Sequence, residues 1–67
     1  MTEIEKTVIL AFAENDMNLS KTAIATHYDR NTIYYRLCCI RKKYGLNPKK
    51  FYDLIELVKM AKGSEKE

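Results

Sequence analysis

The chain of 67 residues has no tryptophan, one histidine, one proline, two glycines and two cysteines. This scarcity of glycine and proline, with 46% hydrophobic and 31% charged residues, excludes a disordered or low-complexity chain and favours a folded, mostly helical domain. No apolar run approaches the ~20 residues that a membrane span needs. The acidic start, residues 1–5, is unlike a signal peptide. We therefore expect no membrane partner.

The two cysteines, Cys38 and Cys39, are adjacent, so their side chains diverge and cannot join distant segments. This usage favours a reduced protein, which we expect to be cytoplasmic. With His27 the cysteines cannot supply the four ligands of a structural zinc site. The sequence also has no glycine-rich phosphate loop and no metal-ligand spacing. We expect no metal, no cofactor and no enzymatic activity.

Charge is distributed unevenly along the chain. The segment from Lys21 to Lys50 contains eight lysines and arginines and a single acid, Asp29, which give it a charge of +7. The rest of the chain has a charge of −4, and the total is +3. A basic centre between acidic ends is the pattern expected of a surface that binds a polyanion, although a solvated helix face has the same composition.

The spacing of apolar residues predicts an all-α domain of four helices with short connections. The first helix begins with a capping box, in which Thr2 and Glu5 satisfy free backbone amides, and it runs to about Glu14. Asn15 and Asp16 then favour a turn, because their short side chains bond their own backbone.

The second helix is predicted to be short, beginning at Asn18 or Ser20 and ending near His27. The small side chain of Ala23 lets this helix approach the third one closely, with Ile33 packed beneath it. Its inner face is predicted to consist of Leu19, Ala23 and Ile24.

The third helix is predicted over residues 30–44, with Asp29 as its N-cap. At 100° per residue, one side is apolar and predicted to be buried: Ile33, Leu37, Ile40 and Tyr44. The other side carries Asn31, Tyr35, Cys38 and Lys42, with Thr32 and Cys39 at one flank. Gly45 can adopt the left-handed conformation that ends a helix.

Asn47 and Pro48 are predicted to start the fourth helix, as its cap and its first helical residue. Tyr44 and Tyr52 are expected in the core. The domain is expected to span residues 1–62, followed by a flexible tail over residues 63–67. The apolar face of the fourth helix is predicted to contain Phe51, Leu54, Ile55, Val58 and Ala61.

A short helix, a connection of about three residues and a longer helix with a basic outer side are typical of a helix-turn-helix. Such a unit can insert its second helix into the major groove of DNA, with the first residues of that helix at the base edges. The guanidinium of Arg30 matches a guanine edge, and the amide of Asn31 matches an adenine edge. The predicted base contacts are Arg30, Asn31, Thr32 and Tyr35. The predicted phosphate contacts are Ser20, Lys21, Tyr34, Arg36, Lys42 and Lys43.

The segments Asn18–Ala23 and Thr26–Leu37, with the turn Gly45–Pro48, resemble the C-terminal helix-turn-helix of PucR-type regulators, a bacterial family that includes purine-catabolism and sugar-diacid regulators. The resemblance covers about residues 2–62, and a more distant one relates residues 29–37 to the DNA-binding end of the Fis protein. The resemblance to PucR-type regulators implies sequence-specific binding of double-stranded DNA, with a homodimer in the full-length regulator. By the Fis likeness, Arg30 and Thr32 make the main groove contacts. Tyr34 departs from the family pattern, which usually has arginine there.

Two other functions are compatible with the sequence. The basic face could dock an acidic protein partner, which would make the chain a protein-interaction module. The five tyrosines could instead stack on the bases of RNA or of a single DNA strand.

Overall fold

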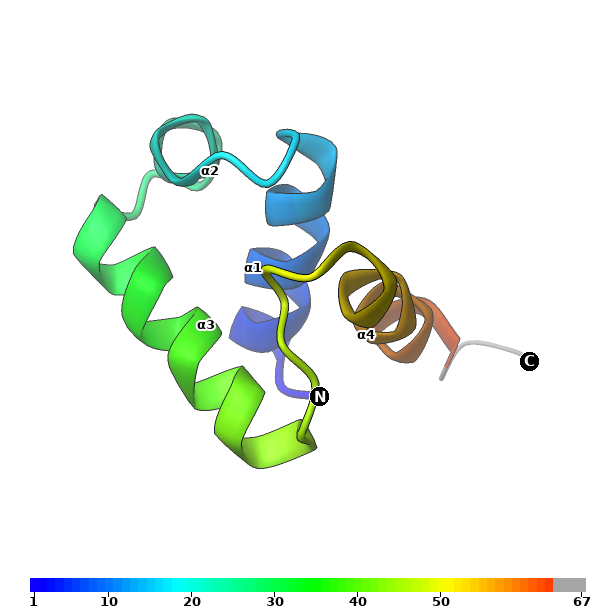
Figure 1. Cartoon of the computed structure of the whole chain (residues 1–67). Coiled ribbons are helices and arrows are strands. Elements are labelled where there is room, and N and C mark those ends of the chain that lie inside the picture. The colour runs from blue at the N-terminus through cyan, green and yellow to red at the C-terminus, as the bar shows by residue number, and fades with distance from the viewer. Residues whose placement is uncertain (64–67) are drawn as a thin grey trace.

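The computed structural model describes residues 1–63, which form four α-helices (Figure 1). They are α1 (Glu3–Glu14), α2 (Leu19–Thr26), α3 (Arg30–Tyr44) and α4 (Phe51–Gly63). Residues 1–63 contain no strand, which confirms the all-α prediction. The tail predicted over residues 63–67 lies outside the described residues, except for Gly63, the last residue of α4. No helix within this range combines the length and apolarity that crossing a membrane requires.

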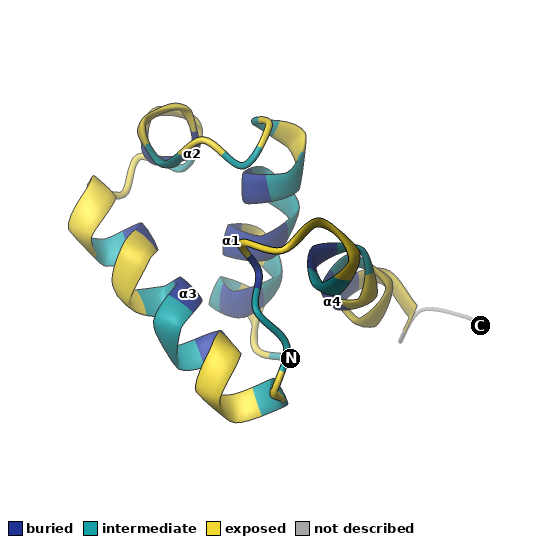
Figure 2. Ribbon diagram, viewed as in Figure 1, coloured by how far each residue is buried: buried dark blue, intermediate teal, exposed yellow. Residues whose placement is uncertain are grey.

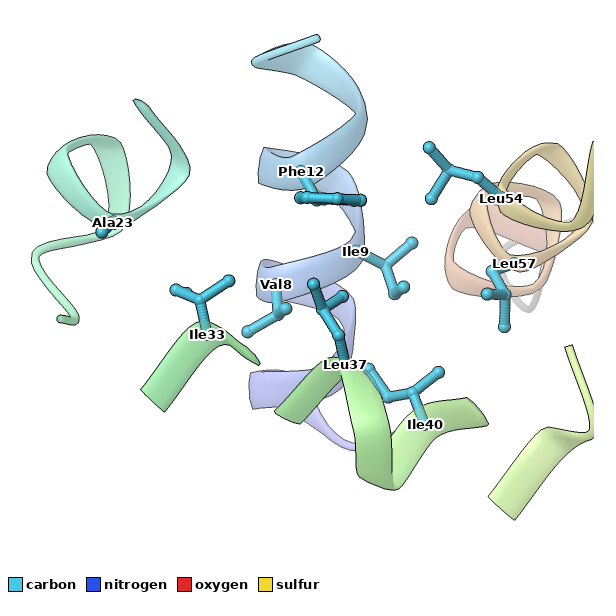
Figure 3. Packing of buried hydrophobic residues seen from close by; sticks show 9 residues of the cluster. All are labelled: Val8, Ile9, Phe12, Ala23, Ile33, Leu37, Ile40, Leu54 and Leu57. Carbon is cyan, nitrogen blue, oxygen red and sulfur yellow. The ribbon is translucent and has the colours of Figure 1, made fainter. Parts of the chain in front are cut away.

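Helix α1 is at the centre of the fold and packs against each of the other three helices (Figure 1). Helix α2 also packs against α3, whereas α3 and α4 lie on different sides of α1. Figure 2 shows that α2, α3 and α4 each turn their buried side toward α1. The core is a single cluster whose side chains come from all four helices (Figure 3): Val8, Ile9, Phe12, Ala23, Ile33, Leu37, Ile40, Leu54 and Leu57.

Local side-chain hydrogen bonds fix where the first two helices begin. The Thr2 N–H donates to Glu5 Oε1 at 3.0 Å and the Glu5 N–H donates to Thr2 Oγ1 at 3.3 Å, which confirms the capping box. Asn18 caps α2, because its Oδ1 accepts from the Lys21 N–H at 2.9 Å. Of the two starts left open by the sequence, the structure therefore selects Asn18.

The predicted inner face of α2 is wrong at Ile24, which is 76% exposed. Thr22 is fully buried in its place, next to Ala23. Burial of this hydroxyl is possible because Thr22 Oγ1 donates to the Asn18 carbonyl at 2.7 Å. Ile24 follows Thr22 by two positions, or 200° of helix rotation, and so lies on the exposed side of α2.

The start of α4 also differs from the prediction. Asn47 caps a turn and not the helix, because its Oδ1 accepts from the Lys49 N–H at 3.0 Å, and α4 begins only at Phe51. Phe51 is 63% exposed and lines an open groove together with Ala13, Asp16 and Met17. Tyr52 is 80% exposed and does not belong to the core, because it lies 200° around the helix from buried Leu54.

A buried carboxylate joins the end of α3 to the start of α1. Glu5 is only 8% exposed; it accepts a hydrogen bond from the Tyr44 hydroxyl at 2.7 Å and lies 3.3 Å from the Lys43 ammonium. Burial raises the pKa of Glu5, but hydrogen bonds from the Thr2 N–H, Tyr44 and Lys43 outweigh burial and lower this pKa from 4.5 to about 2. The sequence showed Glu5 only as a capping residue.

We expect Tyr44→Phe to lower the free energy of unfolding by about 1–3 kcal/mol at neutral pH, because it removes a hydrogen bond to a buried carboxylate. The stabilisation from a carboxylate with a lowered pKa is complete above the unfolded value of 4.5 and is lost as pH falls toward about 2. The deficit of the variant is therefore expected to shrink with acidification. Urea unfolding at pH 7 and pH 3 measures it.

Tyr52→Phe is the matched control, because its hydroxyl belongs to a residue that is 80% exposed. It should unfold like the unmodified protein at both pH values. Equal stability of the Tyr44 and Tyr52 variants at pH 7 would contradict a structural role for the bond to Glu5.

Candidate nucleic-acid interface

Helices α2 and α3 form a helix-turn-helix with a connection of three residues, His27–Asp29. His27 adopts the left-handed conformation, with φ of 66°, and ends α2 as the sequence predicts for a turn residue. Asp29 caps α3, since its Oδ1 accepts from the Thr32 N–H at 2.7 Å. The hydrogen bond from the Thr32 N–H lowers the pKa of Asp29 below its ordinary value, because it favours the charged form of the carboxylate.

The predicted base contacts lie on the outer side of α3. Arg30, Asn31 and Tyr35 are exposed, Tyr35 to 62%, and Thr32 is half-buried at the flank. The buried side of the same helix consists of Ile33, Leu37 and Ile40, as predicted, with Tyr44 packed against the core. The first two turns of α3 therefore present polar and aromatic side chains to solvent, and the ribbon of Figure 2 is coloured as exposed along this outer side.

The predicted phosphate contacts differ in their surroundings. Ser20 and Lys21 are exposed in the first turn of α2, and Lys42 is exposed on α3. Lys43 is paired with Glu5, and the bond to this carboxylate raises the pKa of Lys43. Arg36 is half-buried, and its Nε has no hydrogen-bond partner among the described residues.

The connection between α3 and α4 brings a further cation to this surface. The Lys49 ammonium lies 4.6 Å from the centre of the Tyr34 ring, and Tyr34 itself is 48% exposed. Lys49 also lines a groove of about 410 Å³ together with Asn18, Leu19 and Ser20 at the start of α2. The count of charges included Lys49, but helical periodicity could not place it because it lies outside a helix.

The remaining chemistry-bearing groups of residues 1–63 do not assemble into a second site. No three His, Cys, Asp or Glu side chains within residues 1–63 come together to hold a metal ion. Cys38 and Cys39 are half-buried free thiols. A groove of about 510 Å³ between α1 and α4 is lined mainly by apolar side chains, with Asp16 and Lys59 as its charged residues.

A comparison with protein families matches residues 7–60 to the PucR C-terminal helix-turn-helix domain. The match begins within α1, includes α2 and α3, and ends within α4. No curated protein and no solved structure matches the chain.

We expect Asp29→Ala to lower the midpoint of thermal unfolding by roughly 4–8 °C, because the Thr32 N–H loses its acceptor and the first turn of α3 frays. Asp29→Asn keeps a capping oxygen and should lose less. Melting followed by circular dichroism measures both variants. Unchanged melting of Asp29→Ala would show that the cap does not hold the first turn.

Proposed function

The chain belongs to the PucR C-terminal helix-turn-helix family, which gives it the role of a DNA-binding domain in transcription regulation, and we propose that it binds double-stranded DNA sequence-specifically as part of a bacterial, cytoplasmic regulator. The observation that carries this proposal is the exposed polar face of α3 directly after a three-residue turn. A helix presented in this way fits the major groove. Helix α3 is the proposed reading helix.

The exposed side chains at the start of α3 have the chemistry needed to read bases. The guanidinium of Arg30 can donate two parallel hydrogen bonds to guanine O6 and N7, and the amide of Asn31 can pair with adenine N6 and N7. Thr32 offers a methyl group to thymine from the flank of the helix, and the exposed Tyr35 lies one turn further along.

The proposed phosphate contacts surround this reading surface and fix the position of the helix without reading sequence. They are Ser20, Lys21, Tyr34, Arg36, Lys42 and Lys43. Lys42 and Lys43 are expected to contribute unequally, because Glu5 already compensates the charge of Lys43. The ammonium of Lys42 is therefore the stronger phosphate contact of the two.

One reading helix contacts few base pairs, so we propose that two copies bind together in the full-length regulator. Their half-sites would then be related by two-fold symmetry and lie ~34 Å apart, or a multiple of that distance. The spacing of half-sites in selected DNA is the direct measurement of this pairing.

Selection from a random duplex library should return a preferred sequence containing such half-sites. Arg30→Ala is then expected to weaken binding to that sequence by about 1–3 kcal/mol and to relax the preference at one base pair, because the bidentate contact is lost. Titrations of the selected and a random duplex measure both effects. An Arg30→Ala variant with unchanged affinity for both duplexes would show that α3 is not the reading helix.

Affinity for duplex DNA is expected to fall with salt, with a log–log slope of about −0.9 per phosphate neutralised. Lys42→Ala should weaken binding to the selected and the random duplex alike, and Lys43→Ala should do so less. Gel shifts at two salt concentrations test this.

The same experiment distinguishes the two other functions. A module that docks an acidic protein would have little affinity for random duplex at low salt. A single-strand binder would release duplex when single-stranded oligonucleotide competes.

A further inference from the structure

The side chain of Lys49 contacts an aromatic ring of α3 and not a carboxylate. Its ammonium lies 4.6 Å from the centre of the Tyr34 ring, within the range of a cation–π contact. Such a contact leaves the positive charge uncompensated and restricts the motion of a long side chain. A restricted cation loses less conformational freedom when it binds an anion than a free surface lysine does.

The position of Lys49 joins two parts of the surface that are separate in the sequence. Through Tyr34 it lies beside the second turn of α3, and through a groove of about 410 Å³ it lies beside Asn18 and Ser20 at the start of α2. Ser20 and Tyr34 are both among the proposed phosphate contacts. Lys49 thus adds a positive charge between them.

No acid in the described part of the chain forms an ion pair with Lys49. The ion pairs within residues 1–63 are Lys43–Glu5 and Lys59–Glu56. Asp53, the acid that contacts the connection, accepts a hydrogen bond at 3.0 Å from the Asn47 N–H. A second exposed cation, Arg41, lines a small pocket together with Tyr34 and Lys49.

We propose that the connection between α3 and α4 binds a DNA backbone phosphate through Lys49, which the Tyr34 ring holds in position. This inference rests on the proposed function and extends the DNA surface beyond the helix-turn-helix itself. The contact carries no sequence information, since an ammonium bound to a phosphate does not touch a base edge. It raises affinity for every duplex.

Lys49→Gln is expected to weaken binding to the selected and the random duplex equally, on the order of fivefold to tenfold at 0.1 M salt. The log–log slope against salt should become less negative by about 0.9. Lys59→Gln is the control for the change in net charge, because it removes one positive charge from α4, on the side of α1 away from α3 (Figure 1), where Lys59 is paired with Glu56. Its slope should equal that of the unmodified protein.

Two variants of Tyr34 test the role of the ring. Tyr34→Phe keeps the ring and removes only the hydroxyl, whereas Tyr34→Leu removes the support of Lys49. Adding Lys49→Gln to Tyr34→Phe should cost as much affinity as it does in the unmodified protein. Adding it to Tyr34→Leu should cost less, because Lys49 is no longer held there.

The outcomes separate this inference from the proposed function. If Lys49→Gln and Lys59→Gln have the same affinity and slope while Arg30→Ala still weakens binding, the contact through Lys49 is wrong and α3 remains the reading helix. Loss of affinity for the selected duplex alone also overturns a phosphate contact. An equal effect of Lys49→Gln in the Tyr34→Phe and Tyr34→Leu backgrounds overturns the role of the ring. If the unmodified protein does not bind duplex DNA, the proposed function itself fails.

Discussion

The packing of α3 on α1 is the constraint on which the rest of the surface depends. Ile33, Leu37 and Ile40 are buried in the core cluster that also contains Val8, Ile9 and Phe12 of α1 (Figure 3). Because these residues recur at helical spacing, burying them fixes the rotation of α3 about its axis, and the exposed side chains follow from that rotation. The Asp29 cap at one end and the Glu5 carboxylate at the other hold the ends of the same helix. A rotation by one residue, 100°, would bury polar groups that have no partner in the core.

The sequence predicts most of α3 because several independent signals agree there. The N-cap indicates where the helix begins, the glycine indicates where it ends, and the apolar spacing agrees with both. The structure has these bounds at Arg30 and Tyr44. The outer faces of α2 and α4 could not be predicted in the same way. Ile24 and Tyr52 each lie 200° around their helix from a buried residue, Thr22 and Leu54, but which side of a helix is buried depends on where the neighbouring helices pack, and the apolar spacing of these two helices did not single out that side. The bond from Tyr44 to Glu5 joins residues 39 positions apart, and Lys49 reaches Tyr34 only because the chain turns back after α3.

The lysines and arginines of the basic segment, residues 21–50, have equal formal charges, but in the folded chain these charges differ in how available they are to a ligand. Lys42 and Lys43 are exposed neighbours on α3, yet Lys43 is paired with the buried Glu5 carboxylate, whereas Lys42 has no ion pair within residues 1–63. Arg36 is half-buried and its Nε has no hydrogen-bond partner within residues 1–63, whereas Arg30 is exposed at the start of the helix. The charge of +7 read from residues 21–50 therefore overstates the charge available to a ligand at one flank of α3. At the other flank Tyr34, Arg41 and Lys49 lie together without an ion pair among the described residues.

The difference in available charge between the two flanks of α3 bears on how so small a domain can discriminate between DNA sequences. Backbone contacts raise affinity for all duplexes equally, so they lengthen the time spent on DNA without improving the choice of site. Discrimination has to come from the few side chains in the first two turns of α3, each worth about 1–3 kcal/mol against a wrong base. A contact through Lys49 would therefore add affinity and leave the ratio between specific and random sites unchanged. Higher specificity then requires a second reading helix, because two copies on one site add their base contacts, whereas further lysines on one copy do not.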